Sequence, residues 1–121
     1  MAALRTPPSI DAFGPGGFRV DGTWRPGSLL ILQDAPRDWR PRGLAEVTVD
    51  DIQAVLAAPR GAVEFLLLGV GPRPGPPPRV VREALQARRL GLEFMTTEAA
   101  ARLHNVLASQ GRLFATALIA L

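Results

Sequence analysis

The strongest constraint on the fold is a run of apolar residues in the middle of the chain. Val63-Glu64-Phe65-Leu66-Leu67-Leu68 shows no alternation of apolar and polar positions. A strand with one face in water alternates with a period of two, whereas a strand covered on both faces is apolar nearly throughout. The sequence therefore predicts a central strand that lies between two covering layers.

The N-terminal part is predicted to form a β-hairpin after an irregular arm. Prolines break the arm, residues 1–12, so we expect a single domain over residues 13–121. Asp21-Gly22 separates two short extended runs and suits a type I′ hairpin turn. A further strand over Ser28 to Leu32 leads into a polar loop that contains Trp39.

Helices and strands are predicted to alternate over the rest of the chain. Thr48 is placed to cap a helix that ends before Pro59 and Gly61. The later elements are a helix from about Pro78 to Leu90 with Gly91 at its C′ position, a strand over Leu92 to Met95, a helix that Thr96 or Thr97 caps and Gly111 ends, and a strand over Leu113 to Ala120. This order predicts a layered α/β domain whose C-terminal half is a β-α-β-α-β unit.

Composition excludes several kinds of chemistry. The 121 residues contain no cysteine and one histidine, so neither a thiolate nucleophile nor a metal site built on cysteines or several histidines is expected. All 14 basic residues are arginine, but they are scattered and the net charge is only +3, which argues against nucleic-acid binding. No apolar run approaches the ~18 residues of a membrane span, and no signal peptide is evident. We therefore expect a cytoplasmic protein without a cofactor.

The glycines after the central strand do not form a phosphate-binding loop. Gly69-Val70-Gly71 begins like a dinucleotide-binding fingerprint, but Pro74 stands where the third glycine is needed. The following loop is rich in proline, which has no N–H group to offer a phosphate. A ligand at the carboxyl ends of the strands is still possible in an open α/β sheet.

No catalytic constellation can be assembled from the side chains. His104 has no acidic partner one helical turn away, and a general base needs an orienting partner. Such a histidine is more often at the surface or partly packed, and Leu103, Val106 and Leu107 are expected to face the core. We therefore predict a protein without enzymatic activity.

Two sets of residues are candidates for binding. Gly69, Gly71, Thr97, Asn105 and Arg112 could form a small ligand pocket near the strand ends, or they could brace loops through hydrogen bonds; the sequence leaves both open.

The second set lies on the helix from Pro78 to Leu90. Arg79, Arg82, Gln86 and Arg89 follow the spacing i, i+3, i+7, i+10 and share one stripe. The stripe could dock an acidic partner, or it could simply be a solvated face.

The chain also resembles a known family in three blocks of residues. The blocks are Phe13-Gly14-Pro15-Gly16-Gly17-Phe18-Arg19-Val20, then Leu68-Gly69-Val70-Gly71, then Met95-Thr96-Thr97 with Ala100, Asn105, Leu107, Gly111 and Arg112. On these residues the chain is similar, from Ile10 to Leu121, to the family of the mitochondrial respiratory complex I assembly factor 3 and its bacterial and archaeal relatives. It departs from the family pattern at Leu103, His104 and Gln110.

The resemblance implies a three-layer α/β fold with a central mixed sheet and no established enzymatic activity. Mitochondrial members help to assemble NADH:ubiquinone oxidoreductase by binding partner proteins. We therefore expect a protein-binding domain whose partners are respiratory-complex or membrane-insertion proteins, with Arg79, Arg82 and Arg89 in the contact surface. The alternative is a small-ligand binder or cryptic enzyme that uses the five-residue pocket. The oligomeric state stays open, a homodimer included.

Overall fold

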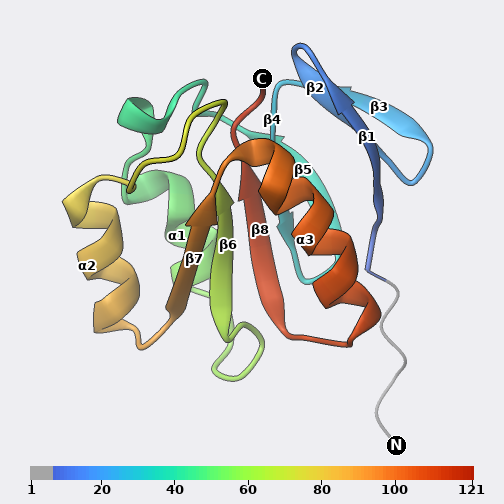
Figure 1. Ribbon diagram of the computed structural model, residues 1–121. Coiled ribbons are helices and arrows are strands. Elements are labelled where there is room, and N and C mark those ends of the chain that lie inside the picture. Colours follow the sequence, from blue (N-terminus) through green and yellow to red (C-terminus); the bar gives the residue numbers. More distant parts are fainter. Residues whose placement is uncertain (1–6) are drawn as a thin grey trace, which may run out of the picture.

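The computed structural model describes residues 7–121, and these form a mixed α/β fold (Figure 1). The strands are β1 Ile10–Gly14, β2 Gly17–Val20, β3 Thr23–Pro26, β4 Ser28–Leu32, β5 Ala35–Trp39, β6 Phe65–Gly69, β7 Gly91–Met95 and β8 Phe114–Leu118. The helices are α1 Gln53–Leu56, α2 Arg79–Ala87 and α3 Thr97–Ser109, and short 3-10 turns cover Leu44–Glu46 and Asp50–Ile52. The predicted alternation of helix and strand in the C-terminal half is confirmed.

Five of the strands form one mixed sheet in the order β5-β4-β8-β6-β7. β8 is the middle strand, antiparallel to β4 and parallel to β6, and β7 continues the parallel part at the edge. Every residue of β6 is buried, as expected for the continuous apolar run. The prediction of a central strand covered on both faces is therefore confirmed.

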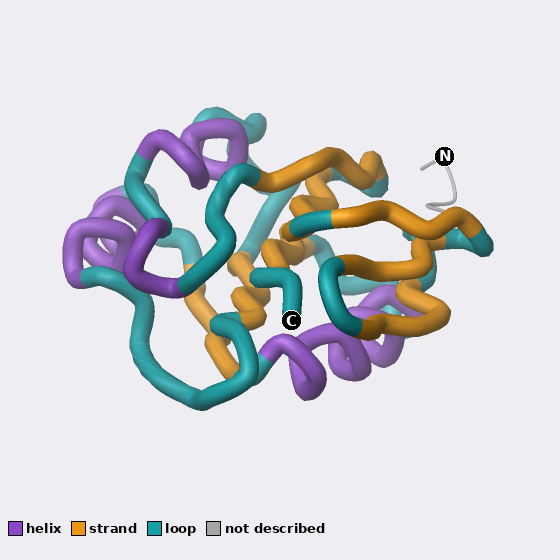
Figure 2. Tube along the Cα trace, turned by 90° about the horizontal axis from the view of Figure 1, so that it is seen from above, coloured by secondary structure: helices purple, strands orange, loops and turns teal. Residues whose placement is uncertain are grey.

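Helices pack on both faces of this sheet and make three layers (Figures 1 and 2). Leu66 and Leu68 of β6 face a core that is shared with α1 and α2, represented by Val55 and Leu85. Leu67 faces the opposite core, which α3 covers with small and aliphatic residues. Neighbouring β6 residues thus alternate between two cores, because successive side chains of a strand point to opposite faces.

The first three strands form a separate antiparallel sheet, which packs on the α3 side of the molecule. Asp21 and Gly22 both have positive φ (47° and 83°), as the predicted Asp-Gly turn requires, so the hairpin of β2 and β3 is confirmed. β1 adds a strand that the sequence did not predict. It begins at Ile10, inside the expected irregular arm, of which residues 1–6 lie outside the described part.

The prediction of a loop around Trp39 is wrong, because these residues form the edge strand β5. Gln33 and Asp34 both adopt positive φ (51° and 64°) and make a tight turn without glycine. The turn pairs Leu32 with Ala35, and β5 then runs antiparallel to β4. A strand at the edge tolerates Pro36, whose missing N–H would break a ladder inside the sheet.

Two expected helix ends differ from the structure. Thr48 does not cap an α-helix through its side chain: its N–H and hydroxyl both donate to the Asp51 carboxylate (2.8 and 2.9 Å), and the α-helical part is only Gln53–Leu56. In α2 the left-handed residue after the helix is Arg89 (φ 57°), not Gly91, which already belongs to β7.

The inward face of α3 also differs from the prediction. Thr97, Ala100, Ala101, His104 and Leu107 are buried, whereas Val106 is 50% exposed. These buried positions are spaced as one helical face. The expectation holds for Leu107 and for Leu103, which is partly buried against the same core, and it is wrong for Val106 and for His104, because it assigned the core to aliphatic residues only.

Candidate functional site

Three of the five pocket candidates meet at the carboxyl end of β6. The Thr97 hydroxyl accepts a hydrogen bond from the Gly71 N–H (2.9 Å) and donates one to the Ile119 carbonyl (2.8 Å). A Cβ on Gly69 would lie 2.9 Å from the Thr97 Cα, so only glycine allows this approach of strand and helix. Thr97 is fully buried. The corner is closely packed, and its hydroxyl is engaged by main-chain groups on both sides.

Asn105 lies two helical turns further along α3, roughly 12 Å from Thr97 along the helix axis. Its Oδ1 accepts from the Ile10 N–H (2.9 Å) and its Nδ2 donates to the Ile10 carbonyl (2.8 Å). A side-chain amide that pairs with both the N–H and the carbonyl of one residue mimics a neighbouring strand. Asn105 thus fastens β1 to α3.

Arg112 lies near the opposite end of β6. Its guanidinium carbon is 5.3 Å from the centre of the Phe65 ring, a cation–π distance. Phe65 is the first residue of β6 and Gly69 the last, which separates the two ends by roughly 13 Å. The structure therefore brings Gly69, Gly71 and Thr97 together, while Asn105 and Arg112 make separate contacts.

His104 is a buried polar residue whose role the sequence did not indicate. Its Nδ1 lies 2.8 Å from the Thr116 hydroxyl, and its Nε2 lies 2.8 Å from the Pro8 carbonyl. Because a carbonyl can only accept, Nε2 carries the proton and Nδ1 accepts from Thr116. Burial lowers the pKa of His104 below its ordinary value of 6.5. The neutral imidazole joins α3, β8 and the segment before β1.

The arginine stripe of α2 is exposed along its length. Arg79 forms an ion pair with Glu83 (2.7 Å), and the Nε of Arg82 donates to the Pro77 carbonyl (3.2 Å). The second contact fastens the proline-rich loop after Gly71 to the helix. Arg89 is exposed but lies two residues beyond the end of α2 in a left-handed conformation, so the predicted helical stripe does not extend to it. Arg79 and Arg82 thus lie near this loop, whereas Arg89 lies past the other end of the helix.

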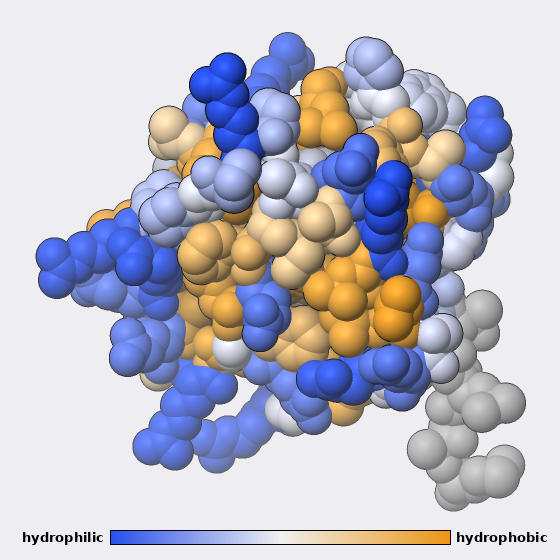
Figure 3. Space-filling model, viewed as in Figure 1, coloured by the Kyte–Doolittle hydropathy of each residue, from blue (hydrophilic) through white to orange (hydrophobic). Residues whose placement is uncertain are grey.

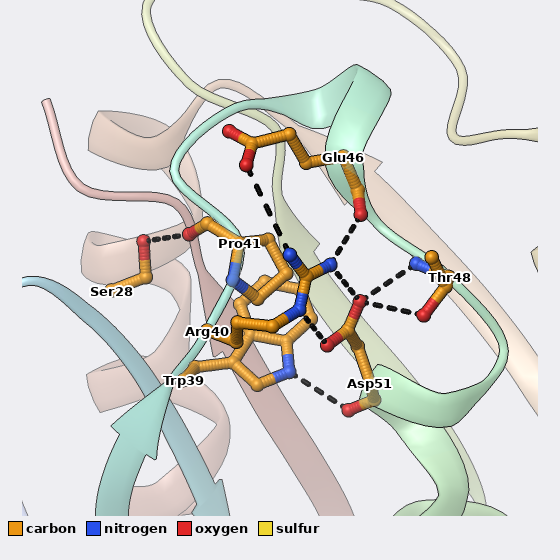
Figure 4. A network of polar contacts seen from close by, with 7 residues as sticks. All are labelled: Ser28, Trp39, Arg40, Pro41, Glu46, Thr48 and Asp51. Atoms are coloured by element: carbon orange, nitrogen blue, oxygen red, sulfur yellow. Dashed lines mark hydrogen bonds and ion pairs between the residues drawn. The ribbon is translucent and has the colours of Figure 1, made fainter.

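A network around Asp51 was not predicted from the sequence (Figure 4). Arg40 donates to both Asp51 carboxylate oxygens (2.8 and 2.6 Å), Thr48 donates to one of them, and the indole N–H of Trp39 donates to the Asp51 carbonyl. The Arg40 hydrogen bonds are the main cause that lowers the pKa of Asp51 to about 2. Because Asp51 is held ionised and fully engaged, the network braces the segment between β5 and α1.

Cavities on the surface of residues 7–121 include two that lie away from the predicted pocket. One, of about 640 Å³, lies between the segment after α1 and the end of α2, and Arg60, Arg88 and Arg89 line it together with apolar residues. The other, of about 520 Å³, lies beside the Asp51 network and includes Ser28, Trp39, Arg40 and Arg42. Neither lining contains Gly69, Gly71, Thr97, Asn105 or Arg112. No helix among residues 7–121 combines the length and apolarity that a membrane crossing requires.

Comparison with known proteins identifies relatives over almost the whole chain. An uncharacterized protein of Rhodobacter capsulatus is 38% identical over 110 residues, which cover 91% of this chain and 82% of that protein. The NADH dehydrogenase [ubiquinone] 1 alpha subcomplex assembly factor 3 of Danio rerio is 31% identical over 111 residues, or 91% of this chain. The chain spans 63% of that assembly factor's length and 59% of the human one's.

A solved structure has the same fold. The crystal structure of an outer membrane protein from Bartonella henselae matches with a TM-score of 0.87 and 32% identity, over 94% of this chain and 95% of that one. The family model described as protein of unknown function (DUF498/DUF598) matches residues 10–119. The chain therefore belongs to the DUF498/DUF598 family, and the complex I assembly factor 3 proteins are among its homologues.

Proposed function

We propose that this chain is a non-catalytic protein-binding domain that acts in the assembly of a membrane complex; its homologues include proteins named NADH dehydrogenase [ubiquinone] 1 alpha subcomplex assembly factor 3. The observation that carries the proposal is the exposed face of α2. Arg79 and Arg82 point into solvent beside Val80, which is 59% exposed, while Val81 and Leu85 anchor the helix in the core and Arg89 is exposed past its end. Arginine beside exposed apolar surface is the composition that protein interfaces favour.

The arrangement of this face supports a docking role. Hydrophilic residues gather on the side of the molecule where α2 lies, next to an apolar area over the middle of the same view (Figure 3). The loop after Gly71 is held against the helix by the Arg82 contact to Pro77 and would contribute to the same surface. An acidic partner would gain complementary contacts and faster association from such a surface. We propose a cytoplasmic location for this chain.

The engagement of these polar side chains with the main chain supports a non-catalytic role. Thr97, His104 and Asn105 each bond a main-chain group, and none lines either cavity. A ligand pocket built from Gly69, Gly71, Thr97, Asn105 and Arg112 would need these residues to converge on one concavity. The geometry favours protein binding over this alternative because only the first three meet.

The test is affinity capture from a detergent-solubilised extract of the native host, read out by mass spectrometry. The wild-type chain is expected to enrich respiratory-complex or membrane-insertion proteins. Arg82→Glu combined with Arg89→Glu should remove them, because the stripe would then repel an acidic partner. The matched control is Arg19→Glu combined with Arg37→Glu, two exposed arginines on β2 and β5. Equal capture by the wild type and the α2 variant would refute the docking face.

A further inference from the structure

The cavity at the end of α2 combines an apolar floor with a cationic rim. The floor comes from Val55, Leu56 and Val63, which are buried, and from half-buried Leu90. The segment after α1 and the end of α2 form its walls. Its volume of about 640 Å³ lies within the range of roughly 300–1,000 Å³ that is usual for binding sites. The cavity is large enough to receive side chains from another molecule.

Three exposed arginines from two separate segments surround this floor. Arg60 lies in the segment after α1, and Arg88 and Arg89 follow α2. The lining contains no aspartate or glutamate, and within residues 7–121 no carboxylate forms an ion pair with any of the three. A concave site with three guanidinium groups and no carboxylate is complementary to a ligand that carries negative charge.

Helix electrostatics explains only part of this arrangement. A cation near a helix C-terminus is favoured by the helix dipole, and this applies to Arg88 and Arg89. It does not account for Arg60, which comes from another segment. Arg89 also occupies the left-handed conformation (φ 57°) in which glycine is the usual residue after a helix. This conformation caps α2, since the N–H groups of Arg89 and Leu90 donate to the Gln86 and Leu85 carbonyls (2.9 and 3.0 Å), and it leaves the Arg89 side chain exposed at the rim of the cavity.

From these features we propose that the cavity binds an acidic peptide segment of the partner protein, with an aliphatic side chain on the floor and flanking carboxylates on Arg60, Arg88 and Arg89. The guanidinium groups select for the carboxylates, and the valine and leucine floor selects for the aliphatic anchor. The inference rests on the proposed protein-binding function and adds a specific site to it. Arg89 belongs both to the candidate partner-binding residues and to this cavity, so a partner could cover the two together.

The test uses the full chain and three short fluorescent peptides. The first alternates glutamate and leucine; the second replaces glutamate by glutamine, and the third replaces leucine by serine. We expect binding of the first peptide by fluorescence anisotropy, and at least about tenfold weaker binding of each of the others, which corresponds to about 1.4 kcal/mol. Amide chemical-shift changes should fall on residues 55–63 and 87–90. Equal affinity of the three peptides, shift changes elsewhere, or no binding at about 1 mM would overturn the proposal.

Substitutions locate the site. Arg60→Gln and Arg88→Gln should each weaken binding of the first peptide by about threefold, as expected for loss of a partly exposed ion pair. Arg37→Gln on β5 should leave the affinity unchanged. If Arg60→Gln binds as the wild type does, the cavity is not the site.

Capture experiments separate this inference from the proposed function. If Arg60→Glu retains a partner that the Arg82→Glu and Arg89→Glu variant loses, the docking function holds and the cavity proposal fails. If the first peptide binds at the cavity but no partner is captured, the cavity's preference for acidic peptides holds and the proposed docking function fails.

Discussion

We expect the Thr97 hydroxyl to make a large contribution to the free energy of unfolding. In Thr97→Val a methyl group replaces the hydroxyl in nearly the same volume. The Gly71 N–H then loses its acceptor and the Ile119 carbonyl loses its donor, and both residues are buried. Because no water reaches these groups, the lost hydrogen bonds are not replaced.

The magnitude follows from these two groups. A buried polar group left without a partner costs about 1–3 kcal/mol, so for two such groups we expect Thr97→Val to lower the free energy of unfolding by about 2–6 kcal/mol. The matched control is Thr97→Ser, which keeps the hydroxyl and removes only a methyl group, at a cost of about 1 kcal/mol. The difference between the two variants isolates the hydrogen bonds from the packing.

Urea unfolding followed by tryptophan fluorescence measures both variants. Trp39 is 6% exposed and donates to the Asp51 carbonyl, so its emission should change on unfolding. The urea midpoint should fall much further for valine than for serine, with an unchanged slope. If Thr97→Val lowered the free energy of unfolding by less than about 1 kcal/mol, or if Thr97→Ser lowered it equally, the hydroxyl would not have the bracing role assigned to it.

Other predictions concern packing and protonation. Gly69→Ala places a Cβ 2.9 Å from the Thr97 Cα and should destabilise by about 1–3 kcal/mol in urea unfolding, whereas Gly43→Ala, with its nearest neighbour at 3.7 Å, should be near neutral. The pKa of Asp51 falls from 3.8 to about 2 on folding, so the stabilisation that its ionised form provides is present above pH 4 and is lost as the pH falls toward 2. Because the Arg40 guanidinium is largely exposed, we expect this stabilisation to be about 1 kcal/mol and to be absent in Asp51→Asn. If the free energy of unfolding fell equally with pH in the wild type and in Asp51→Asn, the prediction would be wrong. The pKa of His104 is lower in the folded than in the unfolded chain, so as the pH falls the unfolded chain takes up a proton first and stability should decrease below pH 6.5. The imidazole NMR signals of this single histidine should titrate with a midpoint below 6.5. A midpoint at or above 6.5 would contradict the buried neutral state.

Where a pattern was strong and local, the sequence was sufficient to predict the structure. The apolar run of β6, the Asp-Gly turn and the glycine that ends α3 each depend on a few neighbouring residues, and the structure confirms all three. The edge strand β5 was missed because its turn uses Gln33 and Asp34 in a conformation that more often calls for glycine or asparagine.

The candidate site was harder to predict because its contacts join distant segments. Asn105 and Ile10 are 95 residues apart, and no periodicity in the sequence reveals that an amide would pair with a strand. The burial of His104 could have been found from its spacing with Ala100, Ala101 and Leu107 on one helical face. The cavity required the loop at Arg60 to be placed beside the end of α2, which only the packed structure provides.

The position of β8 in the sheet determines the order in which this domain can fold. β8 is the last strand along the sequence, yet it separates β4 and β5 from β6 and β7, which have no direct pairing with one another. During synthesis the ribosome releases β4 and β6 long before residues 114–118, and both strands would have an unpaired inner edge until then. The sheet therefore closes only after translation of nearly the whole domain, and until that moment the nascent chain exposes two apolar strand edges that invite aggregation or a chaperone.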